Sequence, residues 1–292
     1  MMAICENRVV IVTGAGGGLG RAYALGFAAE GAKVIVNDIN EKAASDVVET
    51  IKEAGGDAVV NTNDITDYEE SALIVKQAID AFGDLHVVVN NAGICRDRMF
   101  ASLSESDWDA VMAVHLKGHF CIASHAVKYW REQSKGGKAV SARIINTSSG
   151  TGLQGSIGQS NYAAAKGGIA SLTLVQAAEL ARYGITSNGL APAARTGMTE
   201  DVFADVMKKP EDGFDFFAPE NVAPLVVWLG SEQSANVTGK LFEVEGGKIS
   251  IADGWRRGPE KDKGARWEPS EVGSAVAELV AEAVPAQKVY GT

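Results

Sequence analysis

The chain has few of the residues that build metal sites and disulfide frameworks. Its 292 residues include three cysteines, Cys5, Cys95 and Cys121, and only four histidines. The cysteines are odd in number, show no CxxC or metal-ligand spacing, and have no histidine cluster beside them. We therefore interpret them as free thiols in a reducing compartment, expect Cys121 to pack in the core, and predict no metal site.

Positive charge is also scarce. The 27 lysines and arginines face 37 acidic residues, which gives a formal net charge of −10. A surface of that sign argues against a nucleic-acid partner and provides no long-range attraction to anionic lipid. An anionic ligand held by backbone dipoles is still compatible with it.

Long apolar runs are missing as well. No stretch is long enough to span a bilayer, and the first six residues lack the basic region and apolar segment of a secretory signal. We therefore expect no membrane association and a cytoplasmic location.

Short apolar runs alternate with helical segments along most of the chain. The runs predict strands at 8–13, 33–37, 58–61, 85–90, 143–146, 185–190 and 241–244. The intervening patterns predict helices at 19–30, 41–54, 67–82, 106–133, 162–183 and around 226–229. Continuous β-branched strands separated by helices indicate a parallel sheet covered on both faces. The prediction is an α/β, single-domain Rossmann fold with a doubly wound, seven-stranded parallel sheet.

Two stretches depart from this alternation. Residues 192–220 carry several phenylalanines just past the sixth strand, where we predict an apolar flap over the substrate; a short helix packed permanently on the core is the alternative. Residues 251–292 form a polar tail with a helix expected at 270–283. The tail could dock on its own subunit, cover a neighbouring one or meet a substrate phosphate, and docking is favoured. Residues 1–250 are then the dinucleotide-binding domain.

A glycine-rich turn joins the first strand to the first helix. Glycine lets the backbone turn sharply and approach a pyrophosphate, and the helix N-terminus supplies unpaired N–H groups. The strand–turn–helix context distinguishes this turn from a purely structural one. The residues expected at the cofactor are Gly14, Gly16, Gly18, Leu19 and Gly20.

An acidic residue ends each of the next two strand regions. Asp38 lies 18 residues after Gly20, near the spacing of a ribose ligand, and its carboxylate would repel a 2′-phosphate, so NAD is favoured over NADP. Asp64, with Ile65 beside it, is expected at the adenine. A helix N-cap is the alternative for Asp64, and the two roles are compatible.

Tyr162 and Lys166 are four residues apart, which places a phenol and an ammonium on one helix face. A cation beside a tyrosine favours the phenolate, a base suited to taking the proton of an alcohol. Ser149 follows the strand at 143–146 and can present a hydroxyl to the same point. By itself the pair is also compatible with an ordinary amphipathic helix.

In this order and spacing, the motifs resemble the short-chain dehydrogenase/reductase family over residues 8–250. The resemblance implies that Tyr162 is the catalytic acid/base, that Ser149 orients the substrate oxygen, and that Lys166 binds the nicotinamide ribose. It also implies that Thr196 contacts the carboxamide and that Asn90 supports the cofactor side of the sheet. The adjoining motif residues Asn91, Ala92 and Gly93 are expected at the cofactor.

One position departs from the family pattern. The long helix before the serine strand usually carries an asparagine that holds a relay water, and here the matching residue is His115. Imidazole can also anchor a water and can titrate near neutrality, so we include His115 in the catalytic set. A satisfied core histidine is the alternative.

That histidine and its neighbours narrow the resemblance. They are similar to the dehydrogenase domains of the peroxisomal multifunctional type 2 enzymes and to stand-alone bacterial relatives. The resemblance implies 3-hydroxyacyl-CoA dehydrogenase and 17β-hydroxysteroid dehydrogenase activities on an acyl-CoA or steroid substrate. It also implies a homodimer or homotetramer. The matching segments are 36–38, 93–100, 114–118, 191–199 and 222–229.

Three other functions compete with this one. The nearest is an NADPH-dependent 3-oxoacyl-carrier-protein reductase, which Asp38 disfavours. A sugar or polyol dehydrogenase is disfavoured by the apolar residues after Pro192. A non-enzymatic dinucleotide sensor is disfavoured by the intact set of Ser149, Tyr162 and Lys166.

Overall fold

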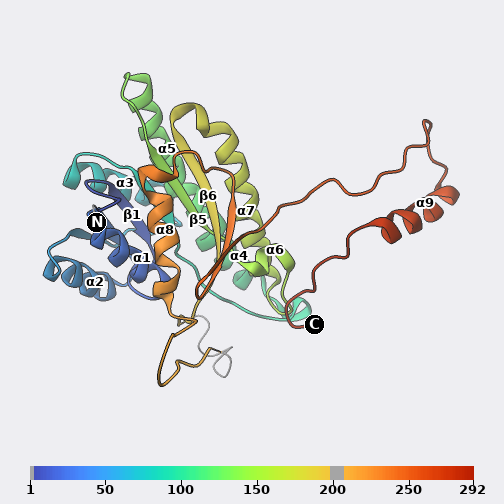
Figure 1. Ribbon diagram of the computed structural model, residues 1–292, viewed down its shortest axis with the longest axis horizontal. Helices are drawn as coiled ribbons and strands as arrows, with labels where there is room; N and C mark the ends of the chain where they lie inside the picture. The colour runs from blue at the N-terminus through green and yellow to red at the C-terminus, as the bar shows by residue number, and fades with distance from the viewer. Residues whose placement is uncertain (1–2, 198–206) are drawn as a thin grey trace.

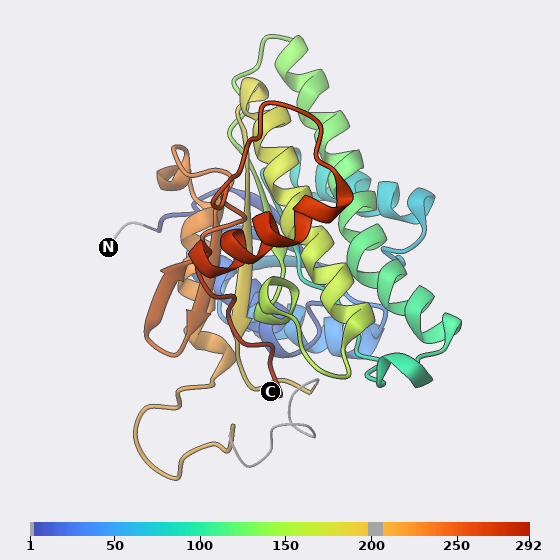
Figure 2. The ribbon, with the colours of Figure 1, turned by 90° about the vertical axis from the view of Figure 1, so that its right-hand side faces the viewer.

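A computed structural model of the chain describes residues 3–197 and 207–292 and shows one α/β sheet flanked by helices (Figures 1 and 2). The strand order is β3-β2-β1-β4-β5-β6-β7-β8. The strands are β1 (Val9–Thr13), β2 (Lys33–Asn37), β3 (Asp57–Asn61), β4 (Val87–Asn90), β5 (Ala142–Thr147), β6 (Ile185–Ala193), β7 (Leu241–Glu245) and β8 (Lys248–Ile251). The seven predicted parallel strands are confirmed, in doubly wound order.

The eighth strand, β8, was not predicted. It pairs antiparallel with β7 across a glycine turn in which Gly246 has φ +52°. All four residues of β8 are exposed. The sequence pattern missed it because an exposed four-residue edge strand carries no burial signal.

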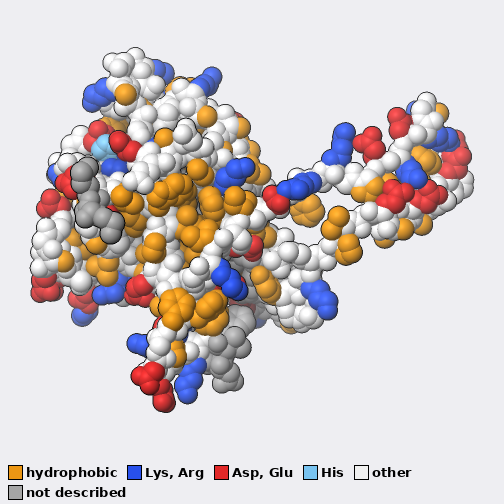
Figure 3. Space-filling model, in the orientation of Figure 1, with side chains coloured by type: hydrophobic (Ala, Val, Ile, Leu, Met, Phe, Trp, Pro, Cys, Tyr) orange, Lys and Arg blue, Asp and Glu red, His pale blue; other side chains and the backbone are white. Residues whose placement is uncertain are grey.

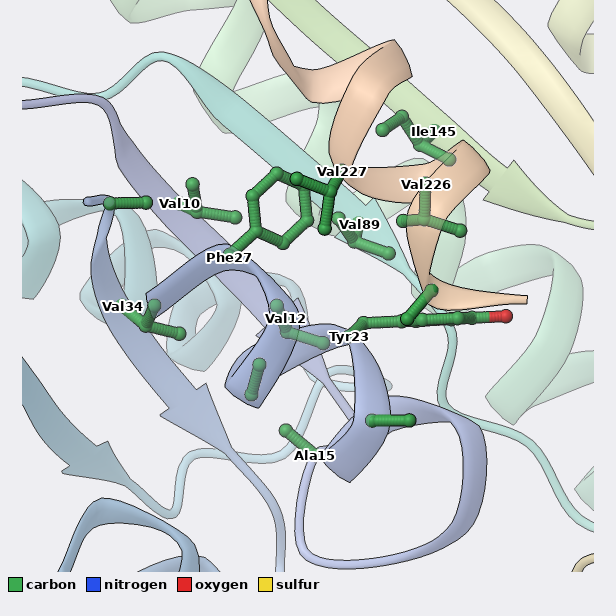
Figure 4. Packing of buried hydrophobic residues seen from close by; sticks show 14 of the residues in the cluster. Val10, Val12, Ala15, Tyr23, Phe27, Val34, Val89, Ile145, Val226 and Val227 are labelled. Atoms are coloured by element: carbon green, nitrogen blue, oxygen red, sulfur yellow. The ribbon is translucent and has the colours of Figure 1, made fainter. Parts of the chain in front are cut away.

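Helices cover both faces of the sheet, as expected. Alternate side chains of β1 enter opposite layers, because successive residues of a strand point to opposite faces. Val10 and Val12 pack under α1 (Gly18–Ala29), α2 (Glu41–Glu53) and α8 (Ala223–Gly230), as Figure 4 shows in part. Val9 and Ile11 pack under α3 (Tyr68–Phe82), α5 (Gly118–Lys135) and the end of α7 (Ser160–Leu180).

The helix expected at 106–133 is divided in the structure. It consists of α4 (Glu105–Met112), a π-helical turn at Ala113–Lys117 and α5. The wider turn carries His115 and turns it into the protein interior, where it is fully buried. π-Turns inside helices are frequent at functional sites, and apolar spacing alone does not predict them.

The predicted flap lies partly outside the described residues, since 198–206, with Met198 and Phe203, are not described. In the described part, Arg195 pairs with Asp215, and its N–H donates to the carbonyl of Phe217 at 2.7 Å. Phe216 packs edge-on against Phe217, with the ring centroids 5.0 Å apart. These contacts join the end of the segment to its beginning, two residues after β6.

The tail leaves the body after β8. It forms an arm with one helix, α9 (Pro269–Glu282), that stands away from the sheet, and the C-terminus then returns to the body (Figure 1). The predicted tail helix is confirmed to within one residue at each end. The surface of the arm mixes both charges with apolar side chains (Figure 3). Among the described residues, no helix is long and apolar enough to cross a membrane, and no cluster of His, Cys, Asp or Glu could hold a metal ion.

Candidate active site

The glycine-rich turn between β1 and α1 is shaped by close backbone contacts. Gly14 has φ +60°, and a Cβ there would lie 2.7 Å from the Cα of Ala92. A Cβ on Gly20 would strike the carbonyl oxygen of Gly14. Larger residues cannot occupy these two positions without moving the backbone.

The N-terminus of α1 fits an anionic group. Its N-cap residue, Gly17, supplies no side-chain cap, and the first turn contains no acidic residue. The first N–H groups of a helix therefore point outward without a side-chain acceptor, together with the positive end of the helix dipole. These are the features that hold a dinucleotide pyrophosphate.

The segment after β4 is fastened to this turn. The hydroxyl of Thr13 accepts hydrogen bonds from the N–H groups of Asn91 and Ala92 at 3.0 and 3.1 Å, and the Asn91 amide donates to the Thr13 carbonyl at 3.0 Å. The predicted residues Asn91 and Ala92 thus lie beside the glycine turn. Gly93 lies against the ring of His115, where a Cβ would collide.

Asp38 lies at the end of β2, facing the turn. Its Oδ2 accepts the Gly16 N–H at 2.9 Å, and its Oδ1 accepts the Asn40 N–H at 2.9 Å. A Cβ on Gly16 would lie 2.9 Å from Oδ2, so glycine is required for the carboxylate to reach the loop. The flanking residues 37–40 include no Lys or Arg to receive a 2′-phosphate.

The two residues predicted near the adenine have different environments. Asp64 accepts the Thr66 N–H at 2.8 Å, whereas the N-cap of α3 is Asp67, so the N-cap alternative for Asp64 is wrong. Ile65 is buried in the core beneath α5, against Gly118. Its side chain therefore packs in the core layer that also contains residues of α3 and α5.

Thr196 and Gly18 lie close together. Gly18 has φ +50°, and a Cβ on it would lie 3.2 Å from Cγ2 of Thr196. The segment after β6 thus reaches the glycine turn. Leu19, the next residue of α1, packs against the core layer that contains Val10 and Val12.

The three predicted catalytic side chains come from neighbouring elements. Ser149 is the N-cap of α6 (Gly150–Gln154) directly after β5, and its Oγ accepts the Thr151 N–H at 3.2 Å. Tyr162 and Lys166 lie on α7, with Lys166 Nζ 5.5 Å from the centre of the Tyr162 ring. Lys166 is 2% exposed, and its Nζ donates to the carbonyl of Thr147 at 2.6 Å.

Burial controls the protonation of this pair. It lowers the pKa of Lys166 from 10.5 to about 7, because a buried ammonium loses its hydration. Burial also raises the pKa of Tyr162, and a hydrogen bond with Ser149 offsets only part of the rise. The net shift of the Tyr162 pKa is therefore upward in the chain by itself, opposite to the predicted lowering, and the phenol keeps its proton.

The prediction that His115 can titrate near neutrality is also corrected by its surroundings. Its ring packs edge-on against Tyr162, with the centroids 5.1 Å apart, and its Nε2 lies 2.7 Å from the carbonyl oxygen of Ile94. Burial, with the positive charge of Lys166, lowers its pKa to about 3. The imidazole is neutral and does not titrate near neutrality. Its buried Nδ1 has no hydrogen-bond partner among the described residues.

A second group of residues at this site was not foreseen. The Asp97 carboxylate accepts from the Gln159 side chain at 2.8 Å, the Arg98 N–H donates to Gly158 O at 2.8 Å, and the Asn161 amide donates to Arg96 O at 3.1 Å. These bonds tie the loop after β4 to the start of the tyrosine helix. Their signal in the sequence was weak: a polar residue directly before Tyr162 and an acidic one four residues after Gly93.

Beneath the site, amides at the strand ends form a buried network. Asn90 Nδ2 donates to Asn146 Oδ1 at 3.0 Å, and Asn146 Nδ2 donates to Thr173 Oγ1 at 3.0 Å and to Gln176 Oε1 at 2.9 Å. Satisfied polar networks of this kind hold neighbouring elements in one geometry. Asn90 therefore links β4 to β5 and, through Asn146, to α7.

Residues 8–206 match the family model described as short chain dehydrogenase. A solved structure, described as a short chain dehydrogenase from Mycobacterium avium, superposes with a TM-score of 0.92 at 58% identity, covering 99% of this chain and 100% of that one.

Three curated proteins illustrate the similarity. Hydroxyacyl-CoA dehydrogenase ChsB1 of Mycobacterium tuberculosis is 41% identical, over 98% of this chain and 93% of that protein. Peroxisomal multifunctional enzyme type 2 of Mus musculus is 46% identical, over 84% of this chain but only 32% of that longer protein. The 3-oxoacyl-[acyl-carrier-protein] reductase FabG of Thermotoga maritima is 36% identical, over 84% of this chain and 98% of that protein.

Proposed function

The chain belongs to the short-chain dehydrogenase family and is an oxidoreductase acting on CH–OH groups, and we propose that it uses NAD to oxidise a 3-hydroxyacyl-CoA to the 3-oxo thioester. The proposed context is β-oxidation of fatty acids or sterol side chains, with 17β-hydroxysteroid oxidation as a further activity. The observation that carries the proposal is the position of Tyr162 between two groups: Lys166 Nζ lies 5.5 Å from its ring centre, and Ser149 hydrogen-bonds with it. The name of one relative, hydroxyacyl-CoA dehydrogenase ChsB1, supports the thioester substrate.

The proposed mechanism assigns one task to each side chain. Ser149 donates a hydrogen bond to the substrate oxygen and so orients the carbinol carbon. Tyr162 takes the hydroxyl proton during oxidation and returns it during reduction. A bound oxidised nicotinamide supplies the hydride acceptor and a positive charge that favours the phenolate.

Lys166 and His115 act on this tyrosine from two sides. With a pKa of about 7, Lys166 can hold or release a proton at physiological pH, and its ammonium stabilises the phenolate electrostatically. His115 stays neutral, and we assign the relay water to its Nδ1, which lacks another partner among the described residues. The proton then leaves through water without a change in the charge of the imidazole.

The choice of NAD rests on Asp38. Its carboxylate is held against the glycine turn by two backbone N–H groups, so it cannot turn away from a 2′-phosphate without losing both hydrogen bonds. Substitution by Asn removes the negative charge and preserves the shape. We expect Asp38→Asn to raise the ratio of the NADPH rate to the NADH rate by at least about ten-fold, as a charge-assisted contact is worth roughly 1.5–3 kcal/mol.

The decisive experiment measures NADH formation with a panel of 3-hydroxyacyl-CoA thioesters, steroid side-chain thioesters and estradiol. Tyr162→Phe should abolish turnover, while NAD binding, followed by quenching of protein fluorescence, stays nearly unchanged. Retained turnover in that variant would remove Tyr162 from the proton transfer. Absence of activity on every thioester, with activity on another alcohol, would reject the substrate while leaving the family assignment intact.

A reductase acting on 3-oxoacyl-carrier protein is the second candidate, because the relative named FabG matches over 98% of its own length. The two functions differ in cofactor and in thioester carrier. Comparing NADH with NADPH, and acyl-CoA with acyl-carrier protein, decides between them. Faster reduction with NADPH and the carrier protein would favour the second candidate.

We also propose that the protein is a homodimer or homotetramer. Three large apolar side chains on the outer faces of α5 and α7 are half exposed: Phe120, Leu174 and Val175. Phe120 also lines an apolar hollow with Met112, Leu116 and Leu172, and an apolar patch of this kind often marks a protein–protein contact. Light scattering coupled to size-exclusion chromatography measures the mass, and a monomer at micromolar concentration would contradict the proposal.

A further inference from the structure

The last residues of the chain return to the body next to Ser149. After the arm of residues 252–288, the Tyr290 N–H donates to the carbonyl of Gly155 at 3.2 Å, and the Ile157 N–H donates to the carbonyl of Tyr290 at 3.0 Å. Tyr290 and Ser156 form a parallel β-bridge at this point. The chain end therefore docks on the loop between α6 and α7, where Figure 1 places the C-terminus.

The Tyr290 side chain lies over the first residue of α6. A Cβ on Gly150 would lie 2.6 Å from the Tyr290 hydroxyl oxygen and 3.2 Å from a ring carbon, so the ring rests where glycine leaves space. Gln154, at the other end of α6, hydrogen-bonds the phenol. Gly150 is the residue after Ser149, which places the ring one residue from the proposed substrate-orienting hydroxyl.

The environment of the ring is half open. Tyr290 is 47% exposed, so a large part of its surface is available for contact with another molecule. Partial burial and the charges of Glu243 and Glu245 on β7 raise its pKa, so the phenol is neutral at physiological pH. A neutral aromatic surface over α6, with two carboxylates of β7 acting on it, favours an apolar neighbour over an anion.

We propose that Tyr290 is a specificity-determining residue whose ring contacts the acyl or steroid portion of the substrate beside Ser149. The inference rests on the proposed function, because it takes Ser149 as the group that binds the substrate oxygen. A hydrogen bond to Ser149 brings that oxygen within about 3 Å of its hydroxyl. A long or branched substituent that leaves the carbinol carbon on the α6 side then meets the Tyr290 ring, whereas a short acyl chain ends before it.

The test compares Tyr290→Ala with Tyr290→Phe in the full-length chain. Val284→Ala is the matched control, since Val284 lies in the same returning segment and is 90% exposed. Substrates are 3-hydroxybutyryl-CoA, 3-hydroxypalmitoyl-CoA and a steroid side-chain thioester. Tyr290→Ala should lower kcat/KM for the two bulky substrates about ten-fold relative to the short one, through KM, as expected for a lost apolar contact. Tyr290→Phe and Val284→Ala should keep the wild-type ratio.

A uniform fall of kcat/KM across the panel would show a merely structural role and overturn the proposal, as would an unchanged ratio. Hydrogen exchange of the Ile157 amide, which donates to the Tyr290 carbonyl, measures the docking of the chain end without any substrate. It should become at least about ten-fold faster in Tyr290→Ala and stay unchanged in Val284→Ala. Fast exchange of the Ile157 amide in the wild-type chain would overturn the docking even if no thioester is a substrate. Inactivity of the wild type on every thioester would reject the proposed function and with it the proposed substrate contact, whereas activity with an unchanged ratio would reject the contact alone.

Discussion

The layer of core under α1 and the surface of α9 show two outcomes for amphipathic helices. Phe27 on α1 is fully buried among Val10, Val34 and Val227 (Figure 4), whereas Val280 on α9 is 70% exposed. Both helices place apolar residues three and four positions apart. The difference is tertiary, because α1 has a sheet beneath it and α9 has solvent. A helix can therefore follow from local sequence, while its contribution to stability depends on what covers it.

The largest expected effect on stability is at Phe27, in the buried core layer under α1. Phe27→Ala should lower the free energy of unfolding by about 3–5 kcal/mol, because it removes a fully buried ring and leaves a cavity under α1. Chemical denaturation measures the loss. Phe27→Leu, which fills most of the space, should cost less than half as much. Equal losses in the two variants would show that the site does not depend on packing volume.

Two glycines of the glycine turn, Gly20 and Gly17, differ in how closely other atoms approach them. Gly20→Ala should lower the free energy of unfolding by about 1–3 kcal/mol, since its Cβ would strike the Gly14 carbonyl and force a backbone shift. Gly17→Ala is the matched control, because no atom lies within 4 Å of its Cβ position and its φ of −160° is an ordinary extended value. Thermal unfolding without dinucleotide measures both. Similar melting temperatures for the two variants would contradict the close-contact explanation.

The same contrast explains what the sequence could predict. Buried strands such as Val9–Thr13 were predictable because burial on both faces leaves a continuous β-branched run. Spacing placed Tyr162 and Lys166 on one helix face, yet it could not give the sign of the Tyr162 shift, which depends on the solvent that the surrounding elements exclude. The neutral state of His115 was missed for the same reason, because the π-turn that buries it leaves no pattern in the sequence.

The buried Lys166 makes the free energy of unfolding depend on pH. Unfolded, a lysine holds its proton up to about pH 10.5, whereas in the folded chain Lys166 releases it near pH 7. The unfolded state thus binds more protons between these values, so the free energy of unfolding rises with pH, by at most about 1.4 kcal/mol per unit. The destabilisation by Lys166 is fully present below pH 7 and is relieved above it.

Lys166→Met should remove this rise, because methionine has similar length and no charge. Denaturant titrations at pH 6, 7, 8 and 9 give the slope for both proteins. Equal slopes in wild type and variant would mean that Lys166 titrates normally in the folded chain. Lys128, which is exposed and donates to the Tyr68 hydroxyl at 2.7 Å, provides the control, and Lys128→Met should leave the slope unchanged.

The smallest effect is expected on α9. Val276 is 48% exposed, so Val276→Ser removes little apolar surface from contact and should change the free energy of unfolding by less than about 0.5 kcal/mol. The helix itself is held by local interactions: the capping box of Glu268 and Glu271, and the ion pair of Lys261 with Glu278 at 2.6 Å. Glu268→Ala should therefore speed amide exchange within α9 without shifting the melting temperature of the body. A shift of several degrees in either variant would show that α9 is covered in solution, and its valines would then belong with Phe27 rather than with the exposed surface.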